Sequence, residues 1–117
     1  MRLNELQVCS VSALKEGRSL GFSYPHGAEV REGFVVCRDG EIRAYRNFCP
    51  HLGIQLNWMP DHFLDFSGEY VVCAMHGALF NVNDGFCVFG PCIGRFLESL
   101  PFRVQEDRVV LILEERA

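Results

Sequence analysis

The sequence predicts an all-β fold, either a small antiparallel sandwich or a small barrel. Short apolar segments of strand length recur along the chain, and turn residues separate them. The Asp-Gly pair at residues 39–40 and the Asn-Asp-Gly turn at residues 83–85 are typical of connections between neighbouring antiparallel strands. Helix signals are confined to residues 12–16 and 94–100, and we expect one helical turn in each.

The strand candidates follow one another in an order that favours local pairing. They are residues 18–24, 33–38, 41–46, 70–73, 79–82, 86–89, 102–105 and 108–113. The second and third candidates flank the Asp-Gly turn, and the last two flank Glu106-Asp107. Each of these two pairs is therefore predicted to form a hairpin. The order of the remaining strands does not follow from the sequence.

Length and composition predict one domain, residues 1–117, with a net charge of −4 and 22% charged residues. The sequence contains no run of basic residues that would indicate nucleic-acid binding. The N-terminus lacks the apolar segment of a secretory signal, and no apolar run is long enough to span a membrane. We therefore expect a cytoplasmic protein that binds no membrane. In that reducing compartment the six cysteines are better explained as metal ligands and core residues than as disulfides.

Two short stretches each bring one cysteine and one histidine together. Cys49 and His51 are two positions apart, Cys73 and His76 are three apart, and a glycine follows soon after each histidine. Spacings this short let two side chains of one tight loop converge on a metal. Zinc accepts two cysteines and two histidines, and so does a [2Fe–2S] cluster with two cysteines on one iron and two histidines on the other. Because each loop supplies one ligand of each kind, we favour the iron–sulfur cluster.

These two stretches resemble the binding boxes of Rieske proteins. The segments Cys-Pro-His-Leu-Gly at residues 49–53 and Cys-Ala-Met-His-Gly at residues 73–77 carry the resemblance, and Gly-Pro at residues 90–91 resembles the proline loop of the family. The resemblance implies a Rieske-like β-sandwich or barrel with an inserted cluster-binding subdomain, about residues 47–92. The remainder of the chain would form a basal β part.

The resemblance also implies a role for each ligand of one [2Fe–2S] cluster. Cys49 and Cys73 would bind the buried iron, and His51 and His76 would bind the outer iron near solvent. The loop that carries Pro91 would cover the cluster.

Four positions differ from the high-potential branch of this family. That branch joins its two boxes by a disulfide, but Ile54 and Ala74 occupy the matching positions. It also uses a serine and a tyrosine hydroxyl as hydrogen-bond donors, where this chain has Ala78 and Phe80. Fewer donors to the sulfurs disfavour the reduced state, so we predict a low-potential centre.

The predicted function is that of a ferredoxin-like single-electron carrier. A reductase would donate the electron, and an oxygenase or a reductase would accept it. The sequence has no nucleotide-binding glycine motif and no second iron site, so we assign no catalytic residue and expect no activity of the chain alone. A small subunit of a nitrite reductase, a Cys2His2 zinc-binding structural module and a cysteine-nucleophile enzyme are the alternatives.

The remaining cysteines and the connection between the boxes have simpler interpretations. We expect Cys87 and Cys92 to pack beside the cluster rather than to form a disulfide. Cys9 and Cys37 are predicted core residues. The connection, residues 52–72, contains aromatic side chains that we expect to anchor it and two acidic side chains that could contact a reductase. These residues are Trp58, Phe63 and Phe66, and Asp61 and Asp65.

Overall fold

The computed structural model describes residues 2–14, 18–50, 53–57, 59–75 and 77–115. Within these ranges the chain forms nine strands and no helix, which confirms the all-β prediction. The strands are β1 (Arg2–Ser10), β2 (Ser19–His26), β3 (Glu29–Arg38), β4 (Glu41–Arg46), β5 (Tyr70–Val72), β6 (Leu79–Asn81), β7 (Cys87–Phe89), β8 (Phe102–Gln105) and β9 (Arg108–Glu115). None of the described segments is a helix that could cross a lipid bilayer.

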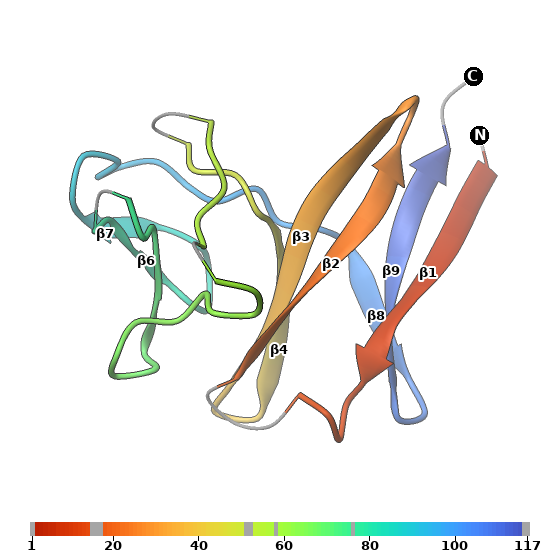
Figure 1. The fold of residues 1–117 in the computed structure, drawn as a ribbon. Coiled ribbons are helices and arrows are strands. Elements are labelled where there is room, and N and C mark those ends of the chain that lie inside the picture. Colours follow the sequence, from red (N-terminus) through yellow and green to blue (C-terminus); the bar gives the residue numbers. More distant parts are fainter. Residues whose placement is uncertain (1, 15–17, 51–52, 58, 76, 116–117) are drawn as a thin grey trace.

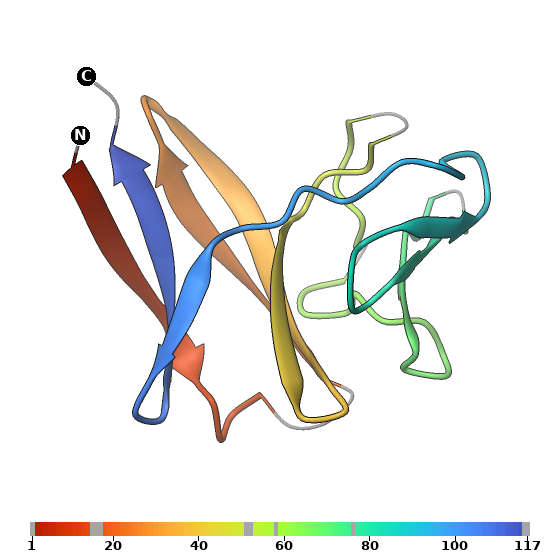
Figure 2. The same ribbon diagram turned by 180° about the vertical axis from the view of Figure 1, so that it is seen from behind.

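The strands form three antiparallel sheets of three strands each. Their orders are β1-β9-β8, β2-β3-β4 and β5-β6-β7. Figure 1 shows the first two sheets packed against each other and the small third sheet on the far side of β3 and β4. The two chain ends lie side by side on β1 and β9, away from the third sheet. Figure 2 shows the segment between β7 and β8 running from the third sheet to the first across the near side of the middle sheet.

The middle sheet is buried on both faces, and β3 shows why. Side chains alternate between the two faces of a strand. Val35 and Cys37 join the core shared with β9, whereas Phe34 and Val36 join the core under the third sheet. The continuous apolar run in β3 is the pattern expected of a strand covered on both sides. A single sheet therefore supports both the basal core and the part of the molecule that contains the cysteine loops.

Local pairing was predicted well. β4 and β8 have the predicted ends, and both predicted hairpins, β3 with β4 and β8 with β9, are present. β1 was missed, although its half-buried Leu6 and Val8 alternate with the exposed Glu5 and Gln7. That alternation is a strand signal. β1 pairs with β9 at the opposite end of the chain, a contact that no local turn sequence indicates.

Neither predicted helical turn is a helix in the described residues. In the first stretch, the Ala13 and Leu14 N–H groups donate to the carbonyl oxygens of Ser10 and Val11 at 3.2 and 3.0 Å, which makes one turn, and the Ser12 hydroxyl group donates to Asp107 of the β8–β9 turn at 2.8 Å. Residues 15 and 16 lie outside the described residues. In the second stretch, residue 94 belongs to a turn and residues 95–100 are extended. Its Phe96 and Ser99 form isolated β-bridges with Phe86 and Tyr45. Main-chain groups paired with other segments in this way are not available for a helix.

Candidate metal centre

Two loops that follow β4 and β5 carry Cys49 and Cys73. Both cysteines have no exposed surface and belong to the same core cluster. Burial of two thiols in one core brings the predicted sulfur ligands into the same region, although residues 52–72 separate them in sequence. His51 and His76, the two predicted imidazole ligands, lie outside the described residues.

The two loops have the same backbone hydrogen-bond pattern. In each, the cysteine N–H donates to the carbonyl oxygen five residues later, and the glycine N–H four residues later donates to the carbonyl oxygen of the cysteine. The distances are 2.7 Å for Cys49 N to Ile54 O, 2.7 Å for Gly53 N to Cys49 O, 2.9 Å for Cys73 N to Ala78 O and 2.8 Å for Gly77 N to Cys73 O. The matched bonds make each loop a tight turn around its cysteine.

The glycines of the two loops are required by backbone conformation. Gly53 has φ +71° and Gly77 has φ +68°, values that residues with a Cβ rarely adopt. This is the physical reason for the glycine that ends each box in the sequence. A Cβ at Gly53 would in addition lie 3.0 Å from the ring of Phe48, which itself stacks under the guanidinium of Arg46 at 4.1 Å from the ring centroid.

Buried polar contacts hold the first loop to the second. The Ala74 N–H of the second loop donates to the carbonyl oxygen of Leu56 at 2.8 Å. The Leu56 N–H in turn donates to the side-chain oxygen of Asn47 at 2.7 Å, and the Asn47 amide donates to the Asn57 side chain at 2.7 Å. The buried Asn47 thus fixes the chain that leaves the first loop. The sequence analysis did not single out Asn47.

A third loop, residues 90–95, lies against both cysteine loops. Arg95 donates a hydrogen bond from its guanidinium to the carbonyl oxygen of Pro50 at 2.8 Å. Gly90 approaches the second loop so closely that a Cβ there would lie 2.8 Å from the Cα of Ala78. Pro91 is exposed on this loop, whereas Cys92 is buried with its sulfur 3.7 Å from that of Cys49. The loop that carries Pro91 therefore lies against both cysteine loops, and its role as a cover of the cluster stays a prediction.

Comparison with protein families identifies this arrangement. The family model described as Rieske [2Fe-2S] domain matches residues 4–109. This chain belongs to the Rieske [2Fe–2S] domain family. The cofactor of the family, a single [2Fe–2S] cluster, is therefore the cofactor of this protein, as the sequence predicted. The comparison with curated proteins gives no match.

Solved structures of similar fold come from a carbazole dioxygenase system. The ferredoxin of carbazole 1,9a-dioxygenase from Nocardioides aromaticivorans IC177 has a TM-score of 0.68 and 19% identity, with 94% of this chain and 98% of that chain covered. A chain from a complex of reduced oxygenase and oxidised ferredoxin in carbazole 1,9a-dioxygenase has a TM-score of 0.70 and 22% identity, over 97% and 96% of the two chains. At these identities the likeness establishes the Rieske fold.

A terminal oxygenase contains a related domain within a longer chain. The terminal oxygenase of carbazole 1,9a-dioxygenase from Novosphingobium sp. KA1 has a TM-score of 0.76 and 19% identity; the match covers 97% of this chain but 30% of the oxygenase chain. The present chain therefore spans less than a third of that oxygenase and nearly all of the ferredoxins.

The described residues fit the sulfur half of a Rieske site. Cys49 and Cys73 are the thiols that the matched loops bury, and thiolates are the ligands that iron–sulfur clusters use. Among the residues the structure describes, which exclude both histidines, no group of three or more His, Cys, Asp or Glu side chains forms a metal site. The same described part of the chain thus offers no competing site elsewhere.

Three of the other four cysteines are buried, whereas Cys9, a predicted core residue, is only partly buried. Cys87 and Cys92 are fully buried in the core that contains Cys49 and Cys73, and the Cys87 thiol donates to the carbonyl oxygen of Phe89 at 3.3 Å. Cys37 is part of the basal core, and Cys9 packs against it. Burial raises the pKa of the Cys9 thiol, which keeps that thiol protonated.

The connection between the loops is anchored by one aromatic ring and by its acidic side chains. Phe63 stacks on Phe34 with ring centroids 4.2 Å apart, whereas Phe66 is fully exposed, so the anchoring prediction is right for Phe63 and wrong for Phe66. Trp58 lies outside the described residues. Asp61 accepts a hydrogen bond from the Gly21 N–H at 2.7 Å, and Asp65 accepts one from the Ser67 hydroxyl at 2.8 Å.

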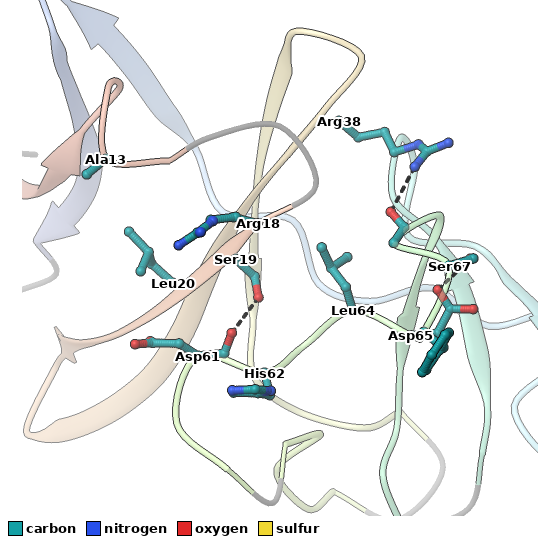
Figure 3. Close-up of a pocket in the computed structure, with 12 residues that line it drawn as sticks. Ala13, Arg18, Ser19, Leu20, Arg38, Asp61, His62, Leu64, Asp65 and Ser67 are labelled. Carbon is teal, nitrogen blue, oxygen red and sulfur yellow. Dashed lines mark hydrogen bonds between the residues drawn. The ribbon is translucent and has the colours of Figure 1, made fainter.

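A surface pocket lies beside this connection rather than at the cysteine loops. Figure 3 shows the Ser19 hydroxyl donating to the backbone of Asp61, with Arg18 and His62 nearby. The pocket is lined by Ala13 and Arg18 before β2, by residues of β2, by the end of β3 and by the connection, and none of the lining residues is a cysteine. The pocket is therefore separate from the metal centre.

Proposed function

We propose that this protein is a single-electron carrier whose [2Fe–2S] cluster is held by Cys49, His51, Cys73 and His76. The observation that carries the proposal is the pair of matched loops, each of which buries one cysteine and has one histidine in its sequence between that cysteine and the glycine. When bound, such a cluster takes up and gives back one electron. The two histidines would form the solvent side of the site, through which electrons enter and leave.

The side chains of the site favour uptake of an electron. Two thiolates offset the charge of two ferric ions and two sulfides, so that with neutral histidines the oxidised site carries no net charge. A neutral site accepts an electron more easily than the anionic site that four thiolates would create. Burial of Cys49 and Cys73 keeps water away from the sulfur side. The imidazole N–H groups of His51 and His76 would hydrogen-bond a partner there.

We place the protein in an oxygenase system, between a reductase that donates the electron and an oxygenase that accepts it. The likeness in fold to ferredoxins of carbazole dioxygenase, over nearly the whole of both chains, supports this role. A small subunit of a nitrite reductase remains the second candidate on the sequence resemblance. We further propose that residues 1–117 form one domain, with residues 47–92 as its cluster-binding part, and that it works in the cytoplasm, where its cysteines stay reduced.

The ligand assignment can be tested on the purified full chain. We expect iron and acid-labile sulfide in equal amounts and the EPR signal of a reduced Rieske centre. His51→Ala and His76→Ala should each abolish that signal, whereas His62→Ala, a change of an exposed histidine of the connection, should leave it unchanged. A wild-type EPR spectrum from either ligand variant would refute the assignment. Bound zinc without sulfide in the wild-type protein would refute the proposed function as a whole.

A further inference from the structure

Cys92 lies in contact with a proposed ligand although it belongs to neither cysteine loop. Its sulfur is 3.7 Å from the sulfur of Cys49, a separation within the range of hydrogen bonds between sulfur atoms, and neither residue has exposed surface. The two residues are 43 positions apart in sequence. The contact is therefore a product of the fold and not of a local turn.

The position of Cys92 is fixed from both sides. Arg95, three residues later, binds the carbonyl oxygen of Pro50, the residue next to Cys49. Gly90, two residues earlier, packs against Ala78, the residue that follows the second loop's glycine. Within the loop the Arg95 N–H donates to the carbonyl oxygen of Cys92 at 2.9 Å. The loop 90–95 thus holds the Cys92 thiol against one cysteine loop while it is itself attached to both.

The direction of the hydrogen bond follows from the chemistry of a ligand. A cysteine that binds iron does so as a thiolate and has no proton to donate, so the proton of the contact must come from Cys92. We propose that the Cys92 thiol donates an S–H···S hydrogen bond to the sulfur of Cys49 and thereby raises the reduction potential of the cluster. This inference rests on the proposed function, because it takes Cys49 to be a ligand.

The expected effect has a definite sign. A donor to a ligand sulfur withdraws negative charge from it and stabilises the reduced site, which carries one more negative charge than the oxidised site. Two other buried side chains of this core, Ala78 and Phe80, have no hydrogen-bond donor to offer. The thiol is a weak donor, so Cys92 adjusts the potential of the site rather than determining its class.

Cys87 provides a matched control for Cys92. Both are buried thiols of the same core, and both follow the second cysteine loop in the sequence. The Cys87 thiol, however, donates to the carbonyl oxygen of Phe89 at 3.3 Å. A change of Cys87 therefore removes a buried thiol without removing a donor to Cys49.

The test is an EPR-monitored redox titration of the full chain with its cluster. We expect Cys92→Ala and Cys92→Val to lower the midpoint potential. At a fixed ambient potential the ratio of reduced to oxidised cluster should fall by up to about tenfold, which corresponds to about 59 mV for a one-electron couple. Cys92→Ser, which keeps a donor, should retain the wild-type midpoint or exceed it. Cys87→Ala should retain the wild-type midpoint.

The set of variants separates hydrogen bonding from packing. Alanine underfills and valine overfills the site of the thiol, so a packing effect would not give both the same shift and would not be reversed by serine. Equal midpoints in wild type, Cys92→Ala and Cys92→Val would overturn the inference while leaving the Rieske assignment intact. Failure of all three Cys92 variants to assemble a cluster would also overturn it, because the inference assigns Cys92 to tuning and not to assembly. Absence of a Rieske signal in the wild type would instead refute the proposed function.

Discussion

The hydroxyl group of Tyr45 lies 2.6 Å from the carbonyl oxygen of Val82 and donates a hydrogen bond to it. Tyr45 belongs to β4 of the middle sheet, whereas Val82 directly follows β6 of the small third sheet. Both residues are buried in the core that contains the cysteines. This bond therefore joins the middle sheet to the third sheet, whose strands β5 and β6 flank the second cysteine loop.

Removal of this hydroxyl group should weaken the junction. Tyr45→Phe keeps the ring but leaves a buried carbonyl oxygen without that donor, and we expect the free energy of unfolding to fall by about 1–3 kcal/mol. Urea denaturation monitored by circular dichroism measures the change. Tyr70→Phe, on a partly exposed tyrosine of β5, is the control and should cost less. Equal stability of the wild type and Tyr45→Phe would contradict the role given to this bond.

The titration of Tyr45 predicts how stability depends on alkaline pH. Burial raises the pKa of Tyr45 to about 12 from its ordinary value of 10.0, with a smaller lowering by Arg43 and a raising by Asp84. Because the folded pKa is the higher one, this contribution to stability is complete below about pH 10 and is lost as the pH rises to about 12. Burial also raises the pKa of Tyr24, so tyrosinate absorbance should show that Tyr45→Phe has lost one of the late-titrating groups of the wild type.

Substitution of two glycines in the loop 90–95 can distinguish the effect of backbone strain from that of steric contact. Gly90 has φ +100° and Gly94 has φ +92°, so alanine at either position costs about 1–2 kcal/mol. At Gly90 the added Cβ would also lie 2.8 Å from the Cα of Ala78, whereas at Gly94 it would meet nothing within 4 Å. Gly90→Ala must therefore displace the loop from the second cysteine loop.

This difference should be visible in the rate at which the cluster is lost. We expect Gly90→Ala to release iron to a chelator clearly faster than the wild type, and Gly94→Ala to release it at close to the wild-type rate. The visible absorbance of the cluster follows the reaction. If both variants lose iron equally fast, close packing of the loop at Ala78 does not protect the site.

Asp61 tests whether the acidic residues of the connection serve the fold. Its carboxylate accepts a hydrogen bond from the Gly21 N–H, and its backbone has φ +63°. Asp61→Ala loses the acceptor and strains the backbone, so we expect a loss of about 1–3 kcal/mol of stability. Asp61→Asn keeps an acceptor oxygen and tolerates positive φ, and should be nearly neutral. A large loss in both variants would indicate that the charge itself is required.

The strands and hairpins that were predicted correctly are those that depend on residues close together in the sequence. The hairpin of β3 and β4 follows from the Asp-Gly turn, where Asp39 and Gly40 both have positive φ. The pairing of β1 with β9 and the bridges of Phe96 and Ser99 depend on segments far apart in sequence, and no local pattern indicates them. Residues 94–100 were misassigned for this reason: their backbone groups pair with distant strands.

The same distinction applies to the site. The Cys and Gly positions of each loop could be predicted from the sequence, because they recur at a fixed spacing within a tight turn. The structure gives both loops the same hydrogen bonds. For Cys92 the sequence predicted only a packing role. Its contact with Cys49 could not be predicted, because the contact depends on how the loop of residues 90–95 folds back against the first cysteine loop. The placement of His51 and His76 remains a prediction, since both lie outside the described residues.

The reduction potential is the property on which the sequence makes its sharpest functional prediction. With Ala78 and Phe80 at positions where the high-potential branch has hydroxyl donors, we expect a midpoint near the lower end of the roughly −150 to +300 mV range of Rieske centres. Phe80 is fully buried in the same core as Cys49 and Cys73, so Phe80→Tyr would introduce a hydroxyl group into that core. We expect the midpoint to rise, as an added donor stabilises the reduced site.

Phe89→Tyr is the matched control for this change, because Phe89 is an exposed phenylalanine of β7 and its added hydroxyl group would face water. An EPR-monitored redox titration of the wild type and both variants decides the matter. We expect the order Phe80→Tyr above the wild type, and Phe89→Tyr equal to it. A positive midpoint in the wild type would contradict the low-potential prediction, because the missing hydroxyl donors would then not determine the potential. An unchanged midpoint in Phe80→Tyr would show that residue 80 does not reach the sulfurs.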